Sequence, residues 1–599
     1  MINETLDQTW NLETIFEGGS HSKAFASFLK QLNEDLNQFQ NTLTETHAPN
    51  TDGETTLWKD IIHKYEALYK RLIEGYAFLE CLTAQNMKDD KASQLFAAIQ
   101  ATAAQFEACS TLLESKYNEF PSDVWKTFIS DPDMQSISFY LNESRQKAKE
   151  RLSADQEKII SSLSIDGYHG WGTLYDTIVS NISIPFDHPV DGKKDLSVGQ
   201  LANLIDDSNR DIRKAAFAAW EKAWHSQDDF CSASLNHLAG FRLQTYKERG
   251  WEKVLKEPLS YNRMSDKTLE TMWQVITDNK SHFVKYLDRK AKLLGLEKLA
   301  WFDVDAPVAT SSKKVTYEES ANFIIEHFHK FNPNMAKFAE HAIKNRWIEA
   351  EDRNGKRPGG FCTSFPLSEE SRIFMTFSGT ASNISTLAHE LGHAYHQSVM
   401  NDLPYLTQHY AMNVAETAST FAEMIVSDAA QAAAKTKEEQ ISFLDEKLGR
   451  SIAFFMNIHA RFLFETRFYE ERKQGIVGID RLNELMLTAQ KEAYCDALSS
   501  YHPAFWQSKL HFYITDVPFY NFPYTFGYLF STGIYVKALE EGATFADKYD
   551  ALLRDTGRMT VEELAEKHLK VDLTKPDFWQ SAVDYAIKDV NDFLELTKD

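Results

Sequence analysis

The stretch TLAHELGHAYHQSVM, residues 386–400, carries three histidines and one glutamate within eight positions. His389, Glu390 and His393 form the pattern H-E-x-x-H. In an α-helix, residues four positions apart differ by about 40° in azimuth and ~6 Å in rise, so both imidazoles can reach one cation. Glu390 then projects beside the metal, where it can hold a water molecule. The stretch therefore predicts a metal-binding helix with an adjacent base.

The pattern has only five residues and also occurs by chance, so its surroundings must support it. The alternative is a helix with two solvated or core histidines. Gly392 is costly in the middle of a helix unless a neighbour packs closely there. Ala388 and Ala394 are small as well, and Asn383 or Ser385 can cap the helix. These features favour a helix packed closely near a site.

A catalytic zinc site needs a third protein ligand and an open position for water. His396 shares the helix face of His389 but lies ~10 Å further along the axis, too far for easy ligation of the same ion. We expect His396 to line the cleft or to support the site. A better ligand is Glu416 in NVAETASTFAEMIVSDAA, residues 413–430. Glu423 lies two turns further along and could orient a ligating histidine.

Composition favours helices over strands, because Gly (24) and Pro (15) are sparse in 599 residues. The net charge of −23 argues against general affinity for nucleic acid or anionic membranes. The chain shows no secretory signal at its start and no run of ~20 apolar residues. Its five cysteines are scattered, which fits a reducing compartment. We expect a cytoplasmic protein without membrane or nucleic-acid partners.

The length of the chain predicts at least two modules. Residues 180–201 hold two prolines, β-branched residues and turn signals, which predict a loop or small hairpin and a boundary near residue 200. We therefore predict an N-terminal helical domain, residues 1–199, and a catalytic domain, residues 200–599. The fold class is all-α, with a small β-hairpin or edge strand near the site.

The best strand candidate is ESRIFMTFSGT, residues 370–380, directly before the metal-binding helix. Its alternating pattern places Ile373, Met375 and Phe377 on one face. We predict an edge that pairs with an extended peptide, so that Phe377, Ser378 and Gly379 contact the substrate. Gly379 would let the peptide backbone approach closely.

HELGHAYH with VAETASTFAE downstream resembles the thimet oligopeptidase and oligoendopeptidase F family of zinc metallopeptidases, and most of all its oligoendopeptidase F branch. Further similar segments are TWNLETIF (9–16), WFDVDAP (301–307) and HFYITDVPFYNFPYTFGY (511–528). The resemblance implies an almost wholly helical fold in which two lobes flank a deep channel. It implies cleavage of oligopeptides at internal bonds.

Carried onto this chain, the resemblance assigns one zinc ion per chain to three ligands, a general base to Glu390, and transition-state donors to a histidine and tyrosines. The ligands are His389, His393 and Glu416; the donors are His511, Tyr520 and Tyr524, with Tyr528 at the substrate. The choice among the tyrosines stays open. A His/His/Glu site also accepts other divalent ions.

Two other functions fit parts of the pattern. One is a non-catalytic, metal-containing peptide binder, against which the intact Glu390 argues. The other is a carboxypeptidase or dipeptidyl carboxypeptidase on the same scaffold, which needs a basic residue for the substrate's C-terminal carboxylate. An assay with a quenched peptide, with and without chelator, would distinguish an enzyme from the binder. The products from a peptide blocked at its C-terminus would distinguish an endopeptidase from the carboxypeptidases. Oligomeric state and cleavage preference do not follow from the sequence.

Overall fold

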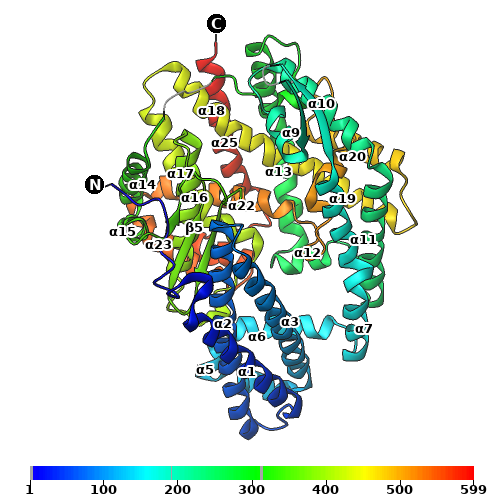
Figure 1. Cartoon of the computed structure of the whole chain (residues 1–599), viewed down its shortest axis with the longest axis vertical. Coiled ribbons are helices and arrows are strands. Elements are labelled where there is room, and N and C mark those ends of the chain that lie inside the picture. The colour runs from blue at the N-terminus through cyan, green and yellow to red at the C-terminus, as the bar shows by residue number, and fades with distance from the viewer. Residues whose placement is uncertain (1–4, 190–191, 310–313, 599) are drawn as a thin grey trace. The chain divides into compact units, whose positions relative to one another are not determined.

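A computed structural model describes residues 5–189, 192–309 and 314–598 (Figure 1). Helices dominate, and the described strands form one two-stranded and one three-stranded sheet. The predicted all-α class with a small strand element is confirmed. The chain forms two compact units, each built from three segments: unit 1 from residues 1–151, 313–429 and 537–570, and unit 2 from residues 152–312, 430–536 and 571–599.

The helices of unit 1 are α1 (Lys23–Glu45), α2 (Thr55–Gln85), α3 (Asp90–Glu119), α4 (Ser122–Ser130), α5 (Pro132–Gln135), α6 (Ser138–Glu150), α14 (Tyr317–Phe331), α15 (Pro333–Lys344), α16 (Ala381–Ser398), most of α17 (Met412–Ala433), α23 (Phe545–Asp555) and α24 (Val561–Leu569). Short 3₁₀ turns are η1 (Gly19–His21), η2 (Asp52–Glu54), η5 (Tyr405–Thr407) and η8 (Gly542–Thr544).

The helices of unit 2 are α7 (Ala154–Ser164), α8 (Gly170–Asn181), α9 (Val198–Ile205), α10 (Arg210–His225), α11 (Asp228–Glu248), α12 (Lys256–Tyr261), α13 (Asp266–Leu293), α18 (Lys437–Ile452), α19 (Ile458–Arg472), α20 (Ile479–Ala493), α21 (Phe505–Ser508), most of α22 (Phe522–Glu541) and α25 (Pro576–Leu596). Two π-helical segments, η3 (Ile165–His169) and η6 (Ala453–Asn457), and two 3₁₀ turns, η4 (Trp301–Asp303) and η7 (Leu510–Phe512), complete it.

Unit 1 has a hydrophobic core built on amphipathic helices. In α1 the buried residues recur every three or four positions, which places Phe25, Leu29, Leu32, Leu36, Phe39 and Leu43 on one face. This core extends from Trp10 to Leu141 and includes Phe365 and Phe374 of the three-stranded sheet. The N-terminal helices therefore share a core with the sheet that precedes α16, the helix with the H-E-x-x-H residues.

The three-stranded sheet has the order β3-β5-β4, with β3 at Ile348–Glu349, β4 at Phe361–Phe365 and β5 at Glu370–Phe374. β5 pairs with β3 in parallel and with β4 antiparallel. The predicted strand is thus present, but it is the middle strand. Our prediction of a free edge at this strand is wrong, because neighbours pair with both of its sides.

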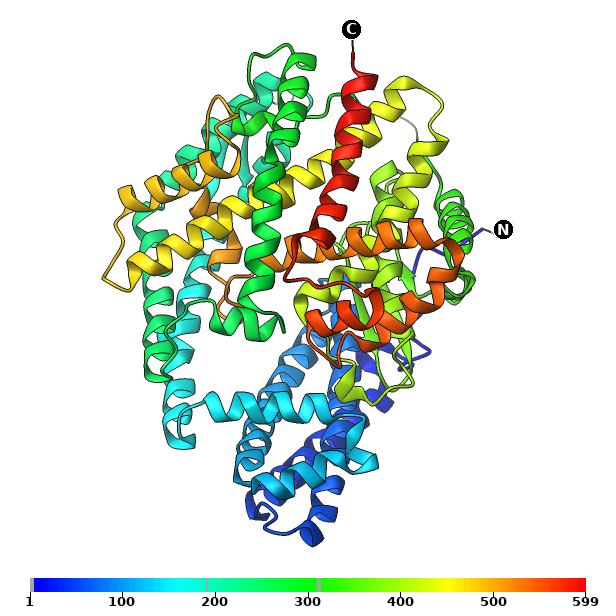
Figure 2. The same ribbon diagram turned by 180° about the vertical axis from the view of Figure 1, so that it is seen from behind.

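Unit 2 contains the hairpin predicted at residues 180–201. β1 (Ser183–His188) pairs antiparallel with β2 (Gly192–Ser197), and the predicted helices follow it. Within this unit α13 and α25 lie side by side in both views (Figures 1 and 2). The division at residue 200 stays a prediction, since the compact units are assembled from segments far apart in the chain.

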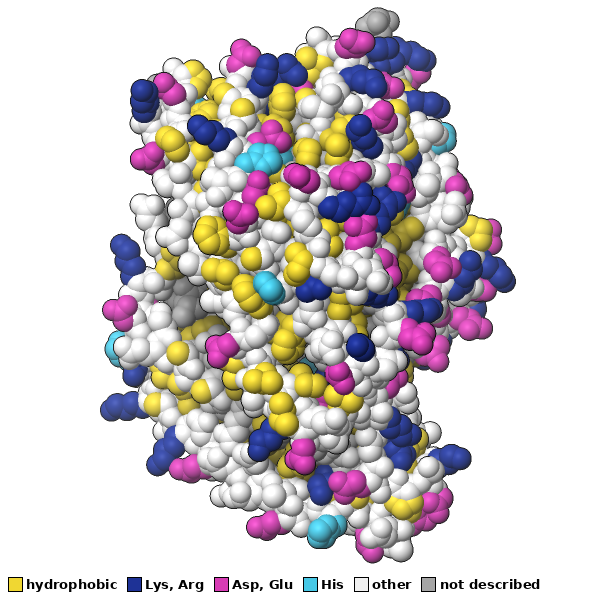
Figure 3. Space-filling view, turned by 90° about the vertical axis from the view of Figure 1, so that its right-hand side faces the viewer, with side chains coloured by type: hydrophobic (Ala, Val, Ile, Leu, Met, Phe, Trp, Pro, Cys, Tyr) yellow, Lys and Arg dark blue, Asp and Glu magenta, His cyan; other side chains and the backbone are white. Residues whose placement is uncertain are grey.

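Charged side chains of both signs are interspersed over the face in Figure 3, as expected for a well-solvated acidic surface. Among the described residues, no helix combines the length and apolar character needed to cross a bilayer.

Candidate metal centre

α16 carries the H-E-x-x-H residues, as predicted. The helix begins after Thr380, and Thr380 and Asn383 form a capping box; the backbone amide of Thr380 donates to Oδ1 of Asn383 at 3.2 Å. The imidazole rings of His389 and His393 lie 4.8 Å apart between centroids. One helical turn therefore brings both rings to the same side of α16.

Gly392 lets α17 pack directly on α16. A Cβ atom at this position would lie 2.6 Å from the carbonyl oxygen of Ala418 and 2.6 Å from Cα of Ser419. The close packing predicted from Gly392 is confirmed. Because the two backbones are almost in contact, Glu416 of α17 reaches the histidines of α16.

Glu416 completes a cluster with His389 and His393. Its Oε2 lies 3.2 Å from Nε2 of His389 and 3.6 Å from Nε2 of His393, and the three ligand atoms all lie within 4.8 Å of one another. Ser419 donates to the same oxygen at 2.8 Å and holds the carboxylate in place. Two ligands at ~2.1 Å from a tetrahedral zinc would be ~3.4 Å apart, so the spacing fits such an ion.

The protonation states of the cluster also suit a metal. Burial lowers the pKa of His393 to about 4, so its imidazole is neutral at neutral pH. Burial alone would raise the pKa of Glu416, but the hydrogen bond with His389 and the charge of His393 outweigh it and lower the pKa to about 2. A neutral imidazole and an ionised carboxylate are the forms that bind metals.

Glu390 lies beside this cluster and is 7% exposed. Burial raises its pKa to about 7; the nearby His389 opposes the rise and the Glu416 carboxylate adds to it. A Cβ atom at Gly360 would lie 3.4 Å from Oε1 of Glu390, so the chain entering β4 runs against this carboxylate. A carboxyl group with a pKa near neutrality can both accept and return a proton.

Glu423 and His396 occupy different surroundings. Oε2 of Glu423 lies 3.3 Å from Nδ1 of His389, on the side of the ring away from Glu416. His396 is fully buried: its Nε2 lies 2.9 Å from Oγ1 of Thr556, and its ring stacks on Tyr410 at 4.2 Å. Such burial does not fit a side chain that lines an open cleft.

The segment after β5 is engaged within unit 1. The amide of Phe377 donates to the carbonyl of Ala350 at 2.8 Å, and that of Ser378 donates to Asn383 at 2.8 Å. Gly379 has φ +80°, and a Cβ atom there would lie 2.9 Å from the carbonyl oxygen of Val315. The close approach that this glycine permits within the chain is therefore to Val315, and its contact with a peptide stays a prediction.

The sequence did not predict the outer strand β4, residues 361–365, which begins directly after Gly360 beside Glu390. The sequence carries only a weak signal for this strand: Gly359 and Gly360 precede the apolar and β-branched run FCTSF. Because strand order depends on pairing between distant residues, the pattern alone does not show which strand is outermost.

In unit 2, His511, Tyr520 and Tyr524 come together. The His511 ring lies 5.4 Å from that of Tyr520 and 6.2 Å from that of Tyr524, and the two tyrosine rings are 5.6 Å apart. All three side chains are partly exposed. Burial lowers the pKa of His511 to about 4, with positive charge on Arg461 and Lys509 acting in the same direction.

Tyr528 follows Tyr524 by four residues on α22 and contacts other residues of unit 2. Its hydroxyl is 3.0 Å from Oγ of Ser451, and its ring stacks on Phe454 at 4.6 Å. Burial raises the pKa of this hydroxyl. Its hydroxyl is therefore engaged within unit 2.

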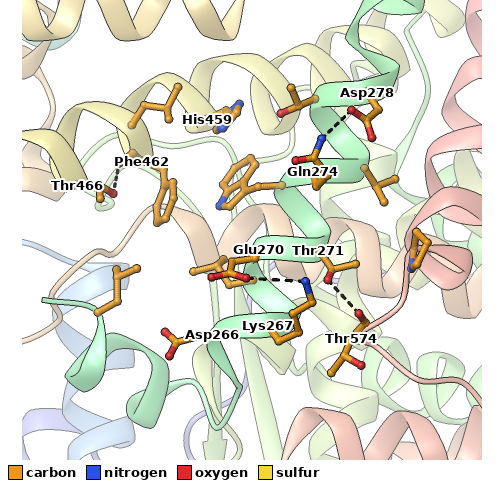
Figure 4. Close-up of a pocket in the computed structure, with 17 residues that line it drawn as sticks. Asp266, Lys267, Glu270, Thr271, Gln274, Asp278, His459, Phe462, Thr466 and Thr574 are labelled. Carbon is orange, nitrogen blue, oxygen red and sulfur yellow. Dashed lines mark hydrogen bonds and ion pairs between the residues drawn. The ribbon is translucent and has the colours of Figure 1, made fainter. Parts of the chain in front are cut away.

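Unit 2 also contains a pocket of about 790 Å³ between α13 and α19 (Figure 4). Its wall includes the stack of Trp273 on His459, with ring centroids 4.3 Å apart. Polar residues on its α13 side pair with one another, as Gln274 does with Asp278 at 2.8 Å. Many of the polar side chains at the rim of this pocket therefore already pair with one another.

Comparison with known proteins identifies the family. The model described as peptidase family M3 matches residues 203–585. The chain belongs to peptidase family M3. It is a metallopeptidase, and a second model, described as oligopeptidase F, matches residues 117–183. The resemblance to the oligoendopeptidase F family is thereby confirmed.

Relatives of this M3 peptidase span nearly the whole chain. Oligopeptidase PepF of Bacillus subtilis is 22% identical over 615 residues, covering 98% of this chain and 87% of the relative. The chromosomal oligoendopeptidase F of Lactococcus lactis subsp. cremoris is 22% identical over 623 residues, covering 98% and 97%.

Solved structures share the fold. A chain from Chlamydophila abortus matches with TM-score 0.83 and 18% identity, covering 99% of each chain. Oligoendopeptidase-F from Enterococcus faecium matches with TM-score 0.69 and 18% identity, covering 96% of this chain and 99% of that one.

Proposed function

We propose that this M3 peptidase is a zinc-dependent oligoendopeptidase that hydrolyses internal bonds of short peptides. The observation that carries the proposal is the convergence of His389, His393 and Glu416 beside Glu390. Relatives named oligoendopeptidase F support the substrate class. An acidic chain with free cysteines suits a reducing cytoplasm, where we propose that it acts.

His389, His393 and Glu416 would hold one zinc ion per chain, and the Glu423 carboxylate would orient the His389 ring through Nδ1. When bound, zinc polarises a carbonyl group and acidifies a water molecule. His396 supports the site from the core of unit 1, where it ties α16 to the end of α23.

Glu390 would act as general base and then as general acid. It accepts the proton of the attacking water and delivers that proton to the leaving amine. A pKa of about 7 favours both steps at neutral pH, because neither protonation state is strongly disfavoured.

His511, Tyr520 and Tyr524 would donate hydrogen bonds to the oxyanion that forms at the scissile carbonyl. Each such donor typically contributes ~3 kcal/mol to transition-state stabilisation. The clustering of the three rings supports an oxyanion-binding role for the three residues together. Which tyrosine is the main donor stays open. Tyr528 is the weaker candidate for substrate contact, because Ser451 engages its hydroxyl.

The peptide would pair with β4 and not with β5. β4 is one of the two outer strands of the three-stranded sheet, and its approach at Gly360 runs beside Glu390. Pairing through the peptide backbone gives affinity with little side-chain selectivity. Phe377, Ser378 and Gly379 remain predicted substrate residues, although their backbone is engaged within unit 1.

Glu390→Gln tests the mechanism. The variant should bind as much metal as the wild type and lose activity on a quenched peptide by ~100-fold or more, because glutamine cannot carry the proton. Retained turnover would refute the role of Glu390.

Mass spectrometry of products from a peptide blocked at its C-terminus tests the reaction type. Internal cleavage that a chelator abolishes supports the endopeptidase. Release of C-terminal residues or dipeptides only from the unblocked peptide would indicate a carboxypeptidase, and metal binding without cleavage would indicate a peptide binder.

A further inference from the structure

The segment that carries Tyr520 is held by buried polar contacts in unit 2. This segment, residues 513–521, connects η7 to α22. Tyr175 stacks on Tyr513 with ring centroids 3.7 Å apart, and the hydroxyl of Tyr168 donates to the carbonyl of Thr515 at 2.8 Å. Both tyrosines come from η3 and α8, more than 300 residues earlier in the chain.

Arg242 of α11 lies at the centre of these contacts and is 4% exposed. Its Nη2 donates to the carbonyls of Ile514 at 3.3 Å and Thr515 at 3.5 Å. Its Nε donates to the hydroxyl of Tyr168 at 2.9 Å, and its Nη1 donates to the hydroxyl of Tyr469 on α19. One guanidinium group therefore joins three elements to the same segment.

A buried guanidinium costs several kcal/mol to remove from water, and apolar residues of similar volume would often be at least as stable. The geometry of the guanidinium group explains why an arginine occupies this position, because its planar shape directs the N–H donors along fixed axes. A lysine at this position would have one ammonium group and could not satisfy the same four acceptors.

The other end of the segment is strained. Phe519 is not glycine, yet it has φ +54°, in the left-handed region. Its ring is buried and lies 5.3 Å from that of Tyr469, the residue that Arg242 contacts. The buried Glu465, one turn before Tyr469 on α19, lies against the backbone of Phe519. Strain of this kind persists only where the surroundings enforce it.

We propose that Arg242 is a positioning residue: through Ile514 and Thr515 on one side and Tyr469 on the other, it holds residues 513–521 in the strained conformation that orients Tyr520. The inference rests on the proposed function, because it takes Tyr520 to be a hydrogen-bond donor in peptide hydrolysis whose orientation affects the rate. Arg242 itself does not touch the substrate. A misplacement of ~1 Å at a donor can lower the rate by ~100-fold.

A small pocket gives access to this network. It has a volume of about 200 Å³ and is lined by Tyr168, Arg242 and Thr515 among others. If Arg242 is shortened to alanine, a guanidinium ion from solution can enter through this pocket and occupy the vacated position. Chemical rescue is therefore a specific test, because general loss of stability would not respond to millimolar guanidinium.

The experiment compares Arg242→Ala and Arg242→Lys with Arg472→Ala. Arg472 of α19 donates to the carbonyl of Asn236 at 2.9 Å, so it also joins α11 to α19, but through Asn236 and not through Ile514 or Thr515. Arg242→Ala should lower kcat on a quenched peptide by ~10–100-fold with KM changed less than ~3-fold, and millimolar guanidinium should restore kcat. Arg472→Ala should change kcat little and should not respond.

Hydrogen exchange supplies a readout that needs no activity. Amides of residues 513–521 should exchange at least ~10-fold faster in Arg242→Ala, while those of α25 should not change. Wild-type kcat and wild-type exchange in Arg242→Ala would overturn the inference, as would a loss that guanidinium does not restore and that Arg472→Ala reproduces. If Arg242→Ala does not fold, Arg242→Lys gives the same comparison without rescue.

The two proposals can fail separately. A wild-type protein that cleaves no peptide would refute the proposed function, and the exchange data would still decide whether Arg242 holds the segment. An active, chelator-sensitive wild type with unimpaired Arg242 variants would refute only the positioning role.

Discussion

Gly392→Ala should weaken metal binding, although residue 392 is not itself one of the proposed metal ligands. The added Cβ would lie 2.6 Å from the carbonyl oxygen of Ala418 and from Cα of Ser419, whereas ordinary contacts begin at 3.4 Å. These are backbone atoms, so α17 must move by roughly 0.8 Å to relieve the overlap. Metal–ligand distances tolerate only ~0.2 Å, and Glu416 lies on the same turn of α17.

We expect the metal affinity of Gly392→Ala to fall by ~10–100-fold, the loss typical when a ligand is no longer held in place. This corresponds to ~1.4–2.7 kcal/mol of binding free energy. Overpacking should cost ~1–3 kcal/mol of folding stability, partly offset by ~1 kcal/mol from the better helix propensity of alanine. Competition with a chromophoric chelator measures the affinity, and denaturant unfolding measures the stability.

Gly449→Ala is the matched control. Gly449 also lies within a helix, α18, but outside its chain neighbours and its own helix backbone no described heavy atom lies within 4 Å of the position that its Cβ would take. Alanine there should raise stability by ~0.5–1 kcal/mol and leave metal affinity unchanged. Wild-type metal affinity in Gly392→Ala would refute the argument that close packing of α16 and α17 places Glu416.

Three further outcomes are expected. Glu416→Ala should lose zinc on dialysis, measured by mass spectrometry of the metal, whereas His396→Ala should keep it; equal losses would contradict the ligand assignment. Glu423→Gln should weaken zinc affinity by ~10–100-fold, because the His389 ring loses its charged acceptor. The folded pKa of His511 is about 4, below the unfolded value of ~6.5, so the unfolded state binds more protons between these values. The stability advantage of wild type over His511→Asn should therefore be constant above pH ~6.5 and decline towards pH ~4; a flat difference in unfolding free energy would refute this pKa.

Local spacing predicted the helix that carries His389, Glu390 and His393 and the roles that we propose for these residues. The four-residue interval between His389 and His393 gives a shared face whatever the rest of the chain does. The same helix arithmetic separated His396 from the ligands, and its burial against Thr556 accounts for its place. Glu416 was predicted as the third ligand in the segment of residues 413–430, downstream of the two histidines.

Strand order could not be predicted in the same way. A two-residue period shows that residues 370–374 form a strand, but β5 becomes the middle strand only because Ile348 and Glu349 pair with it from the other side. Local pattern carries no information on partners outside the strand. The position of β4 as an outer strand, and its approach to Glu390, therefore emerged only from the folded chain.

The sequence by itself determined the helical class, the helix that carries the H-E-x-x-H residues and the family, because each rests on residues close together in the chain or on a motif of fixed spacing. Tertiary structure alone decided which groups meet across long intervals: Gly392 with Ala418, Gly360 with Glu390, and Arg242 with Thr515. These contacts follow from packing and from the pairing of buried polar groups, which depend on the whole fold and leave no periodic trace in the sequence.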